Sequence, residues 1–369
     1  MSHTVSPHPT TSNRLDLDYH AQAASFQKLP YPIIDVHTHL SGASACLLYK
    51  EIARLYGIGM TFSMTDLDEI EVVRSVLGEK VAFIAVPNFR DPDHRWHFGE
   101  GYLRRIEAYH QKGVRIAKFW AAPGAREYGK SIGDPDFMNL DAPARIAAME
   151  LATSLDMILM AHVADPDTWF QTRYKDASQF GTKLDQYRPL RHVLDRFTQP
   201  WIIAHLGGWP EDLEFLTELL EQHPNCHLDT SATKWMVREI SKHEPSHFRD
   251  FITHFQGRIL FGSDILTSDQ HLQPPEEDAT AYSLKANNKQ DAIDLYASRY
   301  WALRTLFESD LKIPSPIADP DLALIDPEGS SPLDGPTLCG MALPDHLLKS
   351  VYHDAATALL LGKGACSND

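Results

Sequence analysis

Short apolar segments recur along the chain between residues 33 and 266. They are continuous apolar runs instead of alternating ones, a pattern typical of parallel strands that are covered on both faces. Eight segments have this character: 33–40, 58–64, 81–89, 113–121, 157–164, 201–208, 225–233 and 259–266. We therefore expect eight buried parallel strands.

Between most of these segments, apolar residues recur three and four positions apart, which is the period of an amphipathic helix. The helical stretches cover residues 45–57, 65–78, 99–113, 141–156, 187–197, 210–224 and 291–309. A strand followed by a helix, repeated eight times, is the composition of a (β/α)8 TIM barrel. The pattern predicts an α/β fold in which residues 31–369 form a single barrel domain.

Long connections and terminal segments interrupt this rhythm. Connections 165–187 and 265–290 follow the fifth and eighth predicted strands, so we expect them over the active-site face of the barrel. The proline-rich stretch 310–343 follows the last barrel helix, and we expect a surface insertion there. A final helix over residues 344–361 closes the chain. Residues 1–30 begin with many Ser, Thr, Pro and His residues and predict a flexible lead-in.

The charge of the chain narrows the kind of partner it has. A formal net charge of -16 over 369 residues offers no basic stripe to nucleic-acid phosphates or to an anionic membrane surface. The four cysteines lie far apart without CxxC spacing, which suits free thiols in a reducing compartment. The N-terminus lacks the apolar core of a secretory signal, and no apolar run approaches the ~18–20 residues of a membrane span. We expect a soluble cytoplasmic protein that acts on a small molecule.

Six polar residues that can take part in a metal site stand near the ends of five predicted strands. His37 and His39 are two positions apart on the first strand, so their imidazoles point to the same face. The other strand ends carry Lys118, His162, His205 and Asp264. In a parallel barrel these ends meet at the face where function collects. The set therefore predicts a metal site assembled from distant strands.

Each of these residues also has a structural explanation when it is considered alone. A histidine in a strand can be a hydrogen-bonded core residue, and Asp264 can cap a following helix. Lys118 can reach solvent from the barrel mouth, or it can anchor a substrate carboxylate. Their joint occurrence at five strand ends favours the metal site, because the separate structural roles would have to coincide there.

The order His-x-His, Lys, His, His, Asp over strands one, four, five, six and eight resembles the amidohydrolase superfamily. The phrases "DVHTHL", "IIAHLGGWPEDL" and "ILFGSDIL" resemble its amidohydrolase 2 branch, and "LPDHLLKSVYHDAATALLL" resembles the closing helix of that branch. The resemblance covers about 33–309 and 341–361. It implies a metal-dependent TIM-barrel enzyme and, by analogy, a homo-oligomer. The branch contains hydrolases, non-oxidative decarboxylases and hydratases, so the motifs leave the reaction open.

The resemblance also implies a role for each strand-end residue. His37 and His39 would bind the more buried ion together with Asp264. In two-metal members, a carbamylated lysine bridges both ions, and the histidines of strands five and six hold the second ion. In one-metal members, one of those two histidines is a ligand and the other transfers a proton. The matching positions in this sequence are Lys118, His162 and His205.

Imidazole and carboxylate ligands suit Zn²⁺ and also Mn²⁺ or Fe²⁺, so we expect one or two divalent ions, with Zn²⁺ as the first choice. Such an ion activates water at neutral pH.

We expect a hydrolase of a small-molecule amide, lactone or ester, with Asp264 and His205 as catalytic residues. The alternative is a non-oxidative decarboxylase of a small aromatic or unsaturated acid, in which His205 or His162 gives a proton to carbon. The intact ligand set argues against a third alternative, a non-catalytic scaffold.

Aromatic and cationic residues that flank the predicted strand ends are candidate substrate contacts. They are Trp120, Arg126, Trp169, Arg173 and Trp209. Such a set suits a flat or apolar substrate that bears a carboxylate. The alternative is that these side chains pack loops onto the barrel or form a subunit contact. For Asp35, two roles are open: it holds a ligand imidazole, or it is a structural carboxylate.

Overall fold

Parallel strands line the interior of the structure, a computed structural model that describes residues 9–274 and 285–362. They are β1 (Ile33–His39), β2 (Ile58–Ser63), β3 (Val81–Phe83), β4 (Ile116–Trp120), β5 (Ile158–His162), β6 (Trp201–Ile203), β7 (Cys226–Asp229), β8 (Ile259–Leu260) and β9 (Ile265–Leu266). The last two are parts of the eighth predicted strand. The strands pair in the orders β3-β2-β1-β9 and β4-β5-β6-β7-β8.

Backbone hydrogen bonds join these two sheets at both edges. Beyond β3, the amide of Ala85 donates to Ile116 O over 2.8 Å, and that of Lys118 donates to Ala85 O over 2.9 Å. Beyond β8, the amide of Val36 donates to Phe261 O over 2.9 Å. The strands therefore follow one another around a ring, and the predicted (β/α)8 barrel is confirmed.

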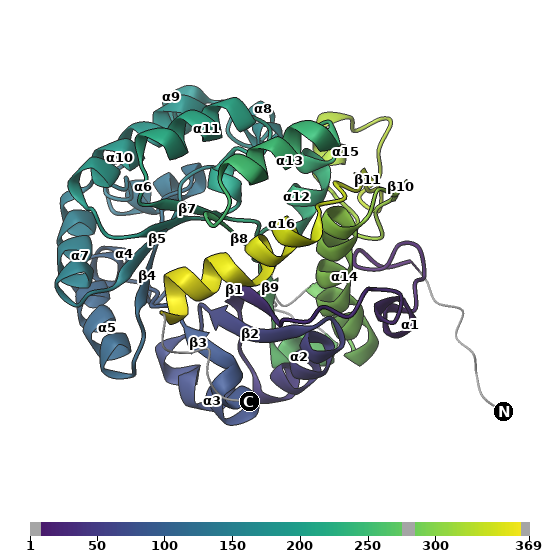
Figure 1. Cartoon of the computed structure of the whole chain (residues 1–369). Helices are drawn as coiled ribbons and strands as arrows, with labels where there is room; N and C mark the ends of the chain where they lie inside the picture. The colour runs from purple at the N-terminus through teal and green to yellow at the C-terminus, as the bar shows by residue number, and fades with distance from the viewer. Residues whose placement is uncertain (1–8, 275–284, 363–369) are drawn as a thin grey trace.

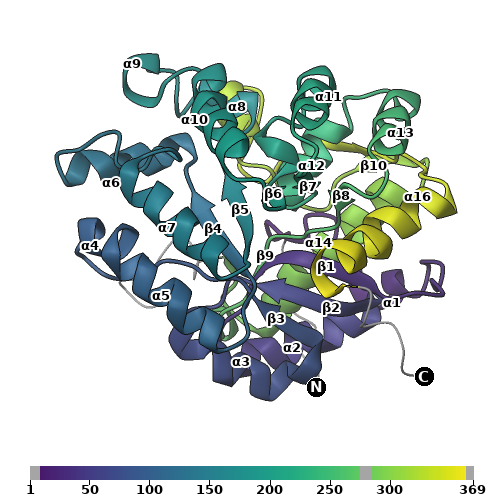
Figure 2. The same cartoon turned by 60° about the vertical axis from the view of Figure 1, so that its left-hand side comes forward.

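Helices follow the strands and cover the outside of the ring (Figures 1 and 2). The longer ones are α2 (Ala43–Leu55), α3 (Ile70–Leu77), α5 (Glu100–Gln111), α7 (Pro143–Ser154), α10 (Lys183–Arg196), α11 (Leu213–Gln222), α12 (Thr233–Ile240), α13 (Pro245–His254) and α14 (Lys289–Glu308). Short helices in the connections are α4 (His94–Phe98), α6 (Arg126–Ser131), α8 (Asp167–Gln171) and α9 (Ala177–Phe180). This cover explains why the strand segments are apolar on both faces. No helix in the described ranges is long and apolar enough to cross a membrane.

Several strands are shorter than the apolar segments that predict them. β6 ends at Ile203, although its segment continues to residue 208, and the eighth strand is interrupted between Leu260 and Ile265. His205 and Asp264 lie in these irregular parts, with positive φ angles of 58° and 61°. Strand pairing stops there because the chain leaves the extended conformation at the residues that turn toward the site.

The sequence predicts a flexible segment over residues 1–30, whereas the structure shows defined contacts for much of it. Residues 1–8 lie outside the described residues, but from residue 9 the chain is ordered and includes α1 (Tyr19–Ala23), which contacts α14. The Tyr19 ring is buried, and its hydroxyl donates to Ser12 O over 2.9 Å. Burial of this large aromatic side chain fixes the segment on the barrel.

The proline-rich segment 310–343, here called the strap, lies against the barrel. It contains an antiparallel pair of strands, β10 (Lys312–Pro314) and β11 (Thr337–Cys339), with α15 (Leu322–Ile325) between them. Figure 1 shows these elements beside α12 and α14. The strap is therefore held by two helices that follow the seventh and eighth strands.

The chain closes with α16 (Asp345–Lys349) and two π-helical turns that reach Leu361. His353 Nδ1 lies 3.0 Å from Pro32 O, just before β1, and Ser350 Oγ accepts a 3.0 Å hydrogen bond from the Gly257 amide, just before β8. In Figure 1 this yellow helix crosses in front of the strands. It covers the amino-terminal end of the barrel and leaves the carboxyl end to the connections that follow the strands.

Candidate metal centre

Two imidazoles and one carboxylate converge at the carboxyl end of β1. His37 Nε2 lies 3.5 Å from Asp264 Oδ1, and His39 Nε2 lies 3.2 Å from the same oxygen. A tetrahedral zinc ion sits about 2.0–2.1 Å from each donor, which places the donors about 3.4 Å apart. The distances from both imidazole nitrogens to Asp264 Oδ1 are close to this spacing, and the three side chains form one of the two groups in the described residues that could hold an ion.

Asp264 combines ligand chemistry with access to solvent. Its side chain is 32% exposed, whereas that of His37 is 2% exposed. Burial raises the pKa of Asp264, but the hydrogen bond to His39 and the nearby His37 outweigh it and hold the pKa well below its ordinary value. The carboxylate is therefore ionised, as a metal ligand must be. Its left-handed backbone aims it toward the two imidazoles.

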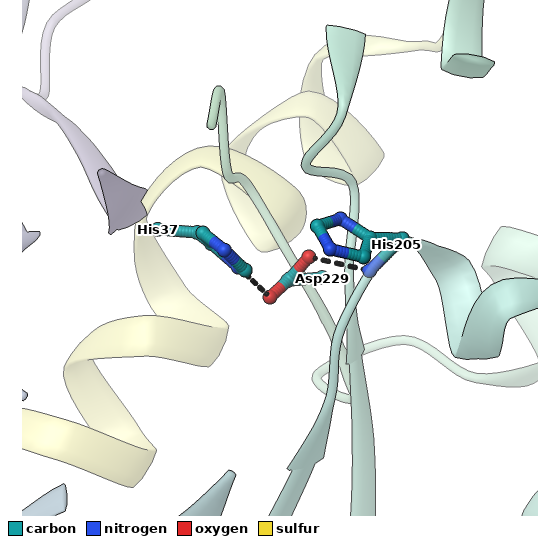
Figure 3. A group of neighbouring side chains, drawn as sticks. All are labelled: His37, His205 and Asp229. Carbon is teal, nitrogen blue, oxygen red and sulfur yellow. Dashed lines mark hydrogen bonds and ion pairs between the residues drawn. The ribbon is translucent and has the colours of Figure 1, made fainter. Parts of the chain in front are cut away.

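The second candidate group joins His37, His205 and Asp229 (Figure 3). Asp229 is the last residue of β7 and is fully buried. Its Oδ2 lies 2.8 Å from His37 Nδ1, and its Oδ1 accepts the His205 amide over 3.0 Å. These are hydrogen-bond distances, so we interpret this group as a network that supports the ligands. An imidazole that binds a metal through one nitrogen commonly donates its other N–H to a carboxylate.

The turn after β6 brings His205 into the site. His205 and Leu206 both have positive φ angles, and Gly207 and Gly208 follow with φ of 70° and 78°. A Cβ on Gly208 would lie 2.4 Å from Ala164 O, which explains why glycine is required there. Burial lowers the pKa of His205 well below its ordinary value, and the neighbouring imidazoles act in the same direction. His205 is therefore neutral and can offer a nitrogen lone pair.

His162, at the end of β5, lies beside His205 with 4.3 Å between the ring centroids. Its Nε2 is 2.8 Å from Asp165 Oδ1, and Tyr174 donates its hydroxyl to Asp165 Oδ2 over 2.7 Å. With Nε2 held by this buried carboxylate, Nδ1 is the nitrogen that stays available. The strand-five and strand-six histidines predicted from the sequence are thus neighbours.

Lys118 lies in the middle of β4 and not at its end, as the sequence analysis expected. The residue is 5% exposed, and within the described residues its Nζ has no hydrogen-bond partner. Burial lowers the pKa of Lys118 to about 8, and the carboxylates of Asp229 and Asp264 oppose this effect. The amine is therefore partly uncharged near neutral pH, and the uncharged form is the one that reacts with carbon dioxide to give a carbamate.

Of the two roles considered for Asp35, its contacts fit that of a structural carboxylate. Its carboxylate accepts hydrogen bonds from Ser263 Oγ over 2.6 Å, from Tyr300 OH over 2.9 Å and from the His37 amide over 3.1 Å. Burial raises the pKa of Asp35 to about 7, although these donors oppose the shift. Asp35 ties β1 to Ser263 in the eighth predicted strand and accepts the backbone amide of His37, while Asp229 holds the His37 imidazole.

Two of the candidate substrate contacts are tied to the strap. Trp169 Nε1 donates to Asp321 Oδ2 over 2.9 Å, and the Arg173 guanidinium stacks 4.5 Å from the Trp169 ring centroid. The Trp169 ring packs edge to face on Trp235 at 5.1 Å, and Trp235 lies 5.6 Å from the His205 ring. The strap therefore supports an aromatic wall that reaches the candidate site.

The other candidate contacts also have partners within the loops. Trp120 packs on Tyr128 with 5.5 Å between centroids, and Arg126 begins α6 with its guanidinium beside Gly181. Trp209 donates to Asp167 Oδ2 over 3.3 Å. These contacts fit the loop-packing alternative, and a substrate role for the five residues stays a prediction.

Sequence reasoning missed three residues that contact the histidines of the site: Asp229, Ser231, whose hydroxyl lies 2.8 Å from His205 Nδ1, and Asp165. A usable signal existed for two of them, because "DTS" lies in the second half of the predicted strand segment 225–233, near the position where other strands carry histidine. Asp165 gives no such signal, since an aspartate in a long loop is common.

Comparison with known proteins places these observations in context. The amidohydrolase family model Amidohydro_2 matches residues 34–361. Similar solved structures include 2,6-dihydroxybenzoate decarboxylase from Rhizobium and a complex of such a decarboxylase with 2,6-dihydroxybenzoate. Both are 12% identical and cover 74% of this chain and 99% of their own, with TM-scores of 0.39 and 0.40. No curated protein matches the sequence.

Proposed function

The chain belongs to the amidohydrolase superfamily, and from this premise we propose that it is a metal-dependent hydrolase of a small-molecule amide, lactone or ester. The observation that carries the proposal is the position of Asp264. One carboxylate oxygen faces the Nε2 atoms of His37 and His39, and the side chain is also partly open to solvent. A ligand in that position can contact both an ion and a water molecule.

His37, His39 and Asp264 would hold the ion, for which Zn²⁺ is our first choice. When bound, it polarises a carbonyl oxygen and lowers the pKa of water from 15.7 to about 7. Asp264 takes a proton from the attacking water. The carbonyl carbon gains the water oxygen, its bond to the leaving nitrogen or oxygen breaks, and Asp264 returns the proton to that atom.

His162 and His205 would complete the site from strands five and six. His205 is a neighbour of the ligand group, since the His37 and His205 ring centroids are 5.0 Å apart, and His162 lies beside His205. The Asp165 contact leaves His162 Nδ1 free to bind an ion. His205 can bind a second ion or, with a single ion, transfer a proton.

Lys118 supports a second candidate function, a non-oxidative decarboxylase of a small aromatic or unsaturated acid. Its Nζ is buried and has no hydrogen-bond partner among the described residues. When protonated, this amine can bind the carboxylate or a phenolate oxygen of such a substrate. In that reaction the carbon–carbon bond breaks, carbon dioxide leaves, and the carbon receives a proton that His205 or His162 has first taken from water.

The test combines metal analysis with two substrate panels. Protein purified without chelator or metal-affinity tag is analysed by elemental mass spectrometry, then assayed on small amides, lactones and esters and, separately, on acids with detection of carbon dioxide. We expect at least one ion per chain and hydrolysis that falls at least about 100-fold in Asp264→Asn. Asp250→Asn, an exposed aspartate on α13, is the matched control.

Two outcomes would contradict the proposal. Carbon dioxide release without hydrolysis would favour the decarboxylase. No bound metal, even after incubation with zinc or manganese, would exclude both candidate functions.

A further inference from the structure

A buried carboxylate and a hydroxyl lie between two of the histidines at the strand ends. Asp229 and Ser231, at the end of β7 and two residues beyond it, are both essentially inaccessible to solvent. Figure 3 shows the Asp229 carboxylate between the imidazole of His37 and the backbone of His205. These four residues lie in or just beyond β1, β6 and β7 and make one hydrogen-bonded cluster.

The contacts of the cluster can be counted proton by proton. Asp229 Oδ1 accepts the amides of His205 and Ser231, each over 3.0 Å, and it also accepts the Ser231 hydroxyl. Asp229 Oδ2 lies 2.8 Å from His37 Nδ1. A carboxylate with this many donors around it is satisfied only as an acceptor.

The Ser231 hydroxyl then determines which nitrogen of each neighbouring imidazole carries a hydrogen. Its hydroxyl has one hydrogen, which goes to Asp229, so the oxygen can only accept from other groups. His205 Nδ1 lies 2.8 Å and His37 Nδ1 lies 2.9 Å from this oxygen. Both Nδ1 atoms therefore face acceptors, and each must carry a hydrogen.

We infer that Asp229 and Ser231 are positioning residues that fix His37 and His205 in the Nδ1–H tautomer. In that tautomer each Nε2 atom presents a lone pair. For His37 this lone pair faces Asp264 Oδ1 at 3.5 Å, an arrangement that favours a cation between them. For His205 it gives a nitrogen able to bind a metal or accept a proton, so one carboxylate–hydroxyl pair prepares both residues together.

Only the role of the two Nε2 atoms in metal binding or proton transfer rests on the proposed function. The tautomers themselves can be measured in metal-free protein. The experiment is ¹⁵N-histidine NMR of the full-length apoprotein, in which pyrrole-type and pyridine-type nitrogens are distinguished. We expect pyrrole-type Nδ1 and pyridine-type Nε2 for both His37 and His205. Assignment uses His37→Gln and His205→Gln.

Two variants separate the two positioning residues. Ser231→Ala removes the acceptor of His205 but leaves Asp229 on His37, so His205 should populate the Nε2–H tautomer while His37 stays unchanged. Asp229→Asn should alter both histidines. Ser263→Ala is the matched control, since in the described part of the chain its hydroxyl donates to Asp35 and accepts from the Ile265 amide, and it has no hydrogen bond to an imidazole.

Metal affinity gives a second readout that does not depend on activity. Zinc competition with a chelator should show about 10- to 100-fold weaker binding in Asp229→Asn, and a smaller loss in Ser231→Ala. Nε2–H tautomers in the wild-type protein, doubly protonated rings at neutral pH, or an unchanged His205 signal in Ser231→Ala would overturn the inference. If Asp229→Asn fails to fold, the Ser231→Ala comparison still decides it. A failure of the substrate assays with the expected tautomers would contradict the proposed function alone.

Discussion

Replacement of Asp321 by asparagine should destabilise the protein by releasing the strap from the barrel. Asp321 Oδ2 accepts Trp169 Nε1 and Lys234 Nζ, both over 2.9 Å, and the Asp321 side chain is 1% exposed. Arg238 and Arg173 lie farther away, at 3.4 and 3.5 Å. The strap therefore carries a buried anion whose cationic partners belong to α12 and to the loop after β5.

The magnitude follows from the pKa of this carboxyl group. Burial raises the pKa of Asp321, but Lys234 and the Trp169 hydrogen bond outweigh it and lower the pKa from 3.8 to about 2. A difference of about 1.8 in pKa corresponds to about 2.4 kcal/mol of stabilisation at neutral pH. The hydrogen bonds to Asp321 give a similar magnitude, since a hydrogen bond to a charged group contributes about 1.5–3 kcal/mol. The half-exposed Arg173 contributes little.

The sign of the pH dependence is fixed by the lowered pKa. The stabilisation is present above the unfolded-state pKa and is lost as the pH falls toward about 2, where the folded-state carboxylate is protonated. The free-energy difference between wild type and Asp321→Asn should thus be about 2.4 kcal/mol above pH 5 and about half of that at pH 3.

The assay is urea unfolding of both proteins between pH 7 and pH 3, followed by circular dichroism. Asp310→Asn, an exposed aspartate at the start of the strap, is the control and should change stability by less than about 0.5 kcal/mol. A difference below about 0.5 kcal/mol for Asp321→Asn at pH 7, or one that does not shrink at pH 3, would refute the reasoning.

Three further outcomes are expected. The double variant His37→Ala, His39→Ala should retain no zinc by elemental mass spectrometry yet keep the wild-type circular dichroism spectrum; full metal content would place the site elsewhere. Lys118→Met should leave stability unchanged or raise it, because it removes a buried amine without a hydrogen-bond partner in the described residues; a loss above about 1 kcal/mol in urea unfolding would contradict this. Gly208→Ala should cost about 1–3 kcal/mol, because φ is 78° and the new Cβ meets Ala164 O. Gly113→Ala, which has a similar φ of 87° and open space around it, should cost less, and equal costs would exclude the clash as the cause.

Part of this protein could be read from the order of residues alone. Continuous apolar runs and helical periods predict a barrel because a parallel sheet is buried on both faces and its helices on one. The position of His37, His39 and Asp264 follows from the same pattern, since the carboxyl ends of all barrel strands meet at one end of the ring.

The strand limits were less accessible to sequence reasoning. The segment around His205 is as apolar as the strand before it, yet β6 ends at Ile203. Hydrophobicity reports burial and not backbone direction, so the left-handed turn through His205 could not be seen. Lys118 was placed at a strand end for the same reason, although it lies inside β4.

The partners of the site were decided by tertiary structure. His37 and Asp229 are 192 positions apart, and Trp169 and Asp321 are 152 apart. A sequence shows which residues are polar, but which polar side chains share a buried proton depends on how the barrel brings its strands together. The sequence determined the barrel and the ligand types; only the closed ring decided that Asp229 serves two histidines and that the strap holds the aromatic wall.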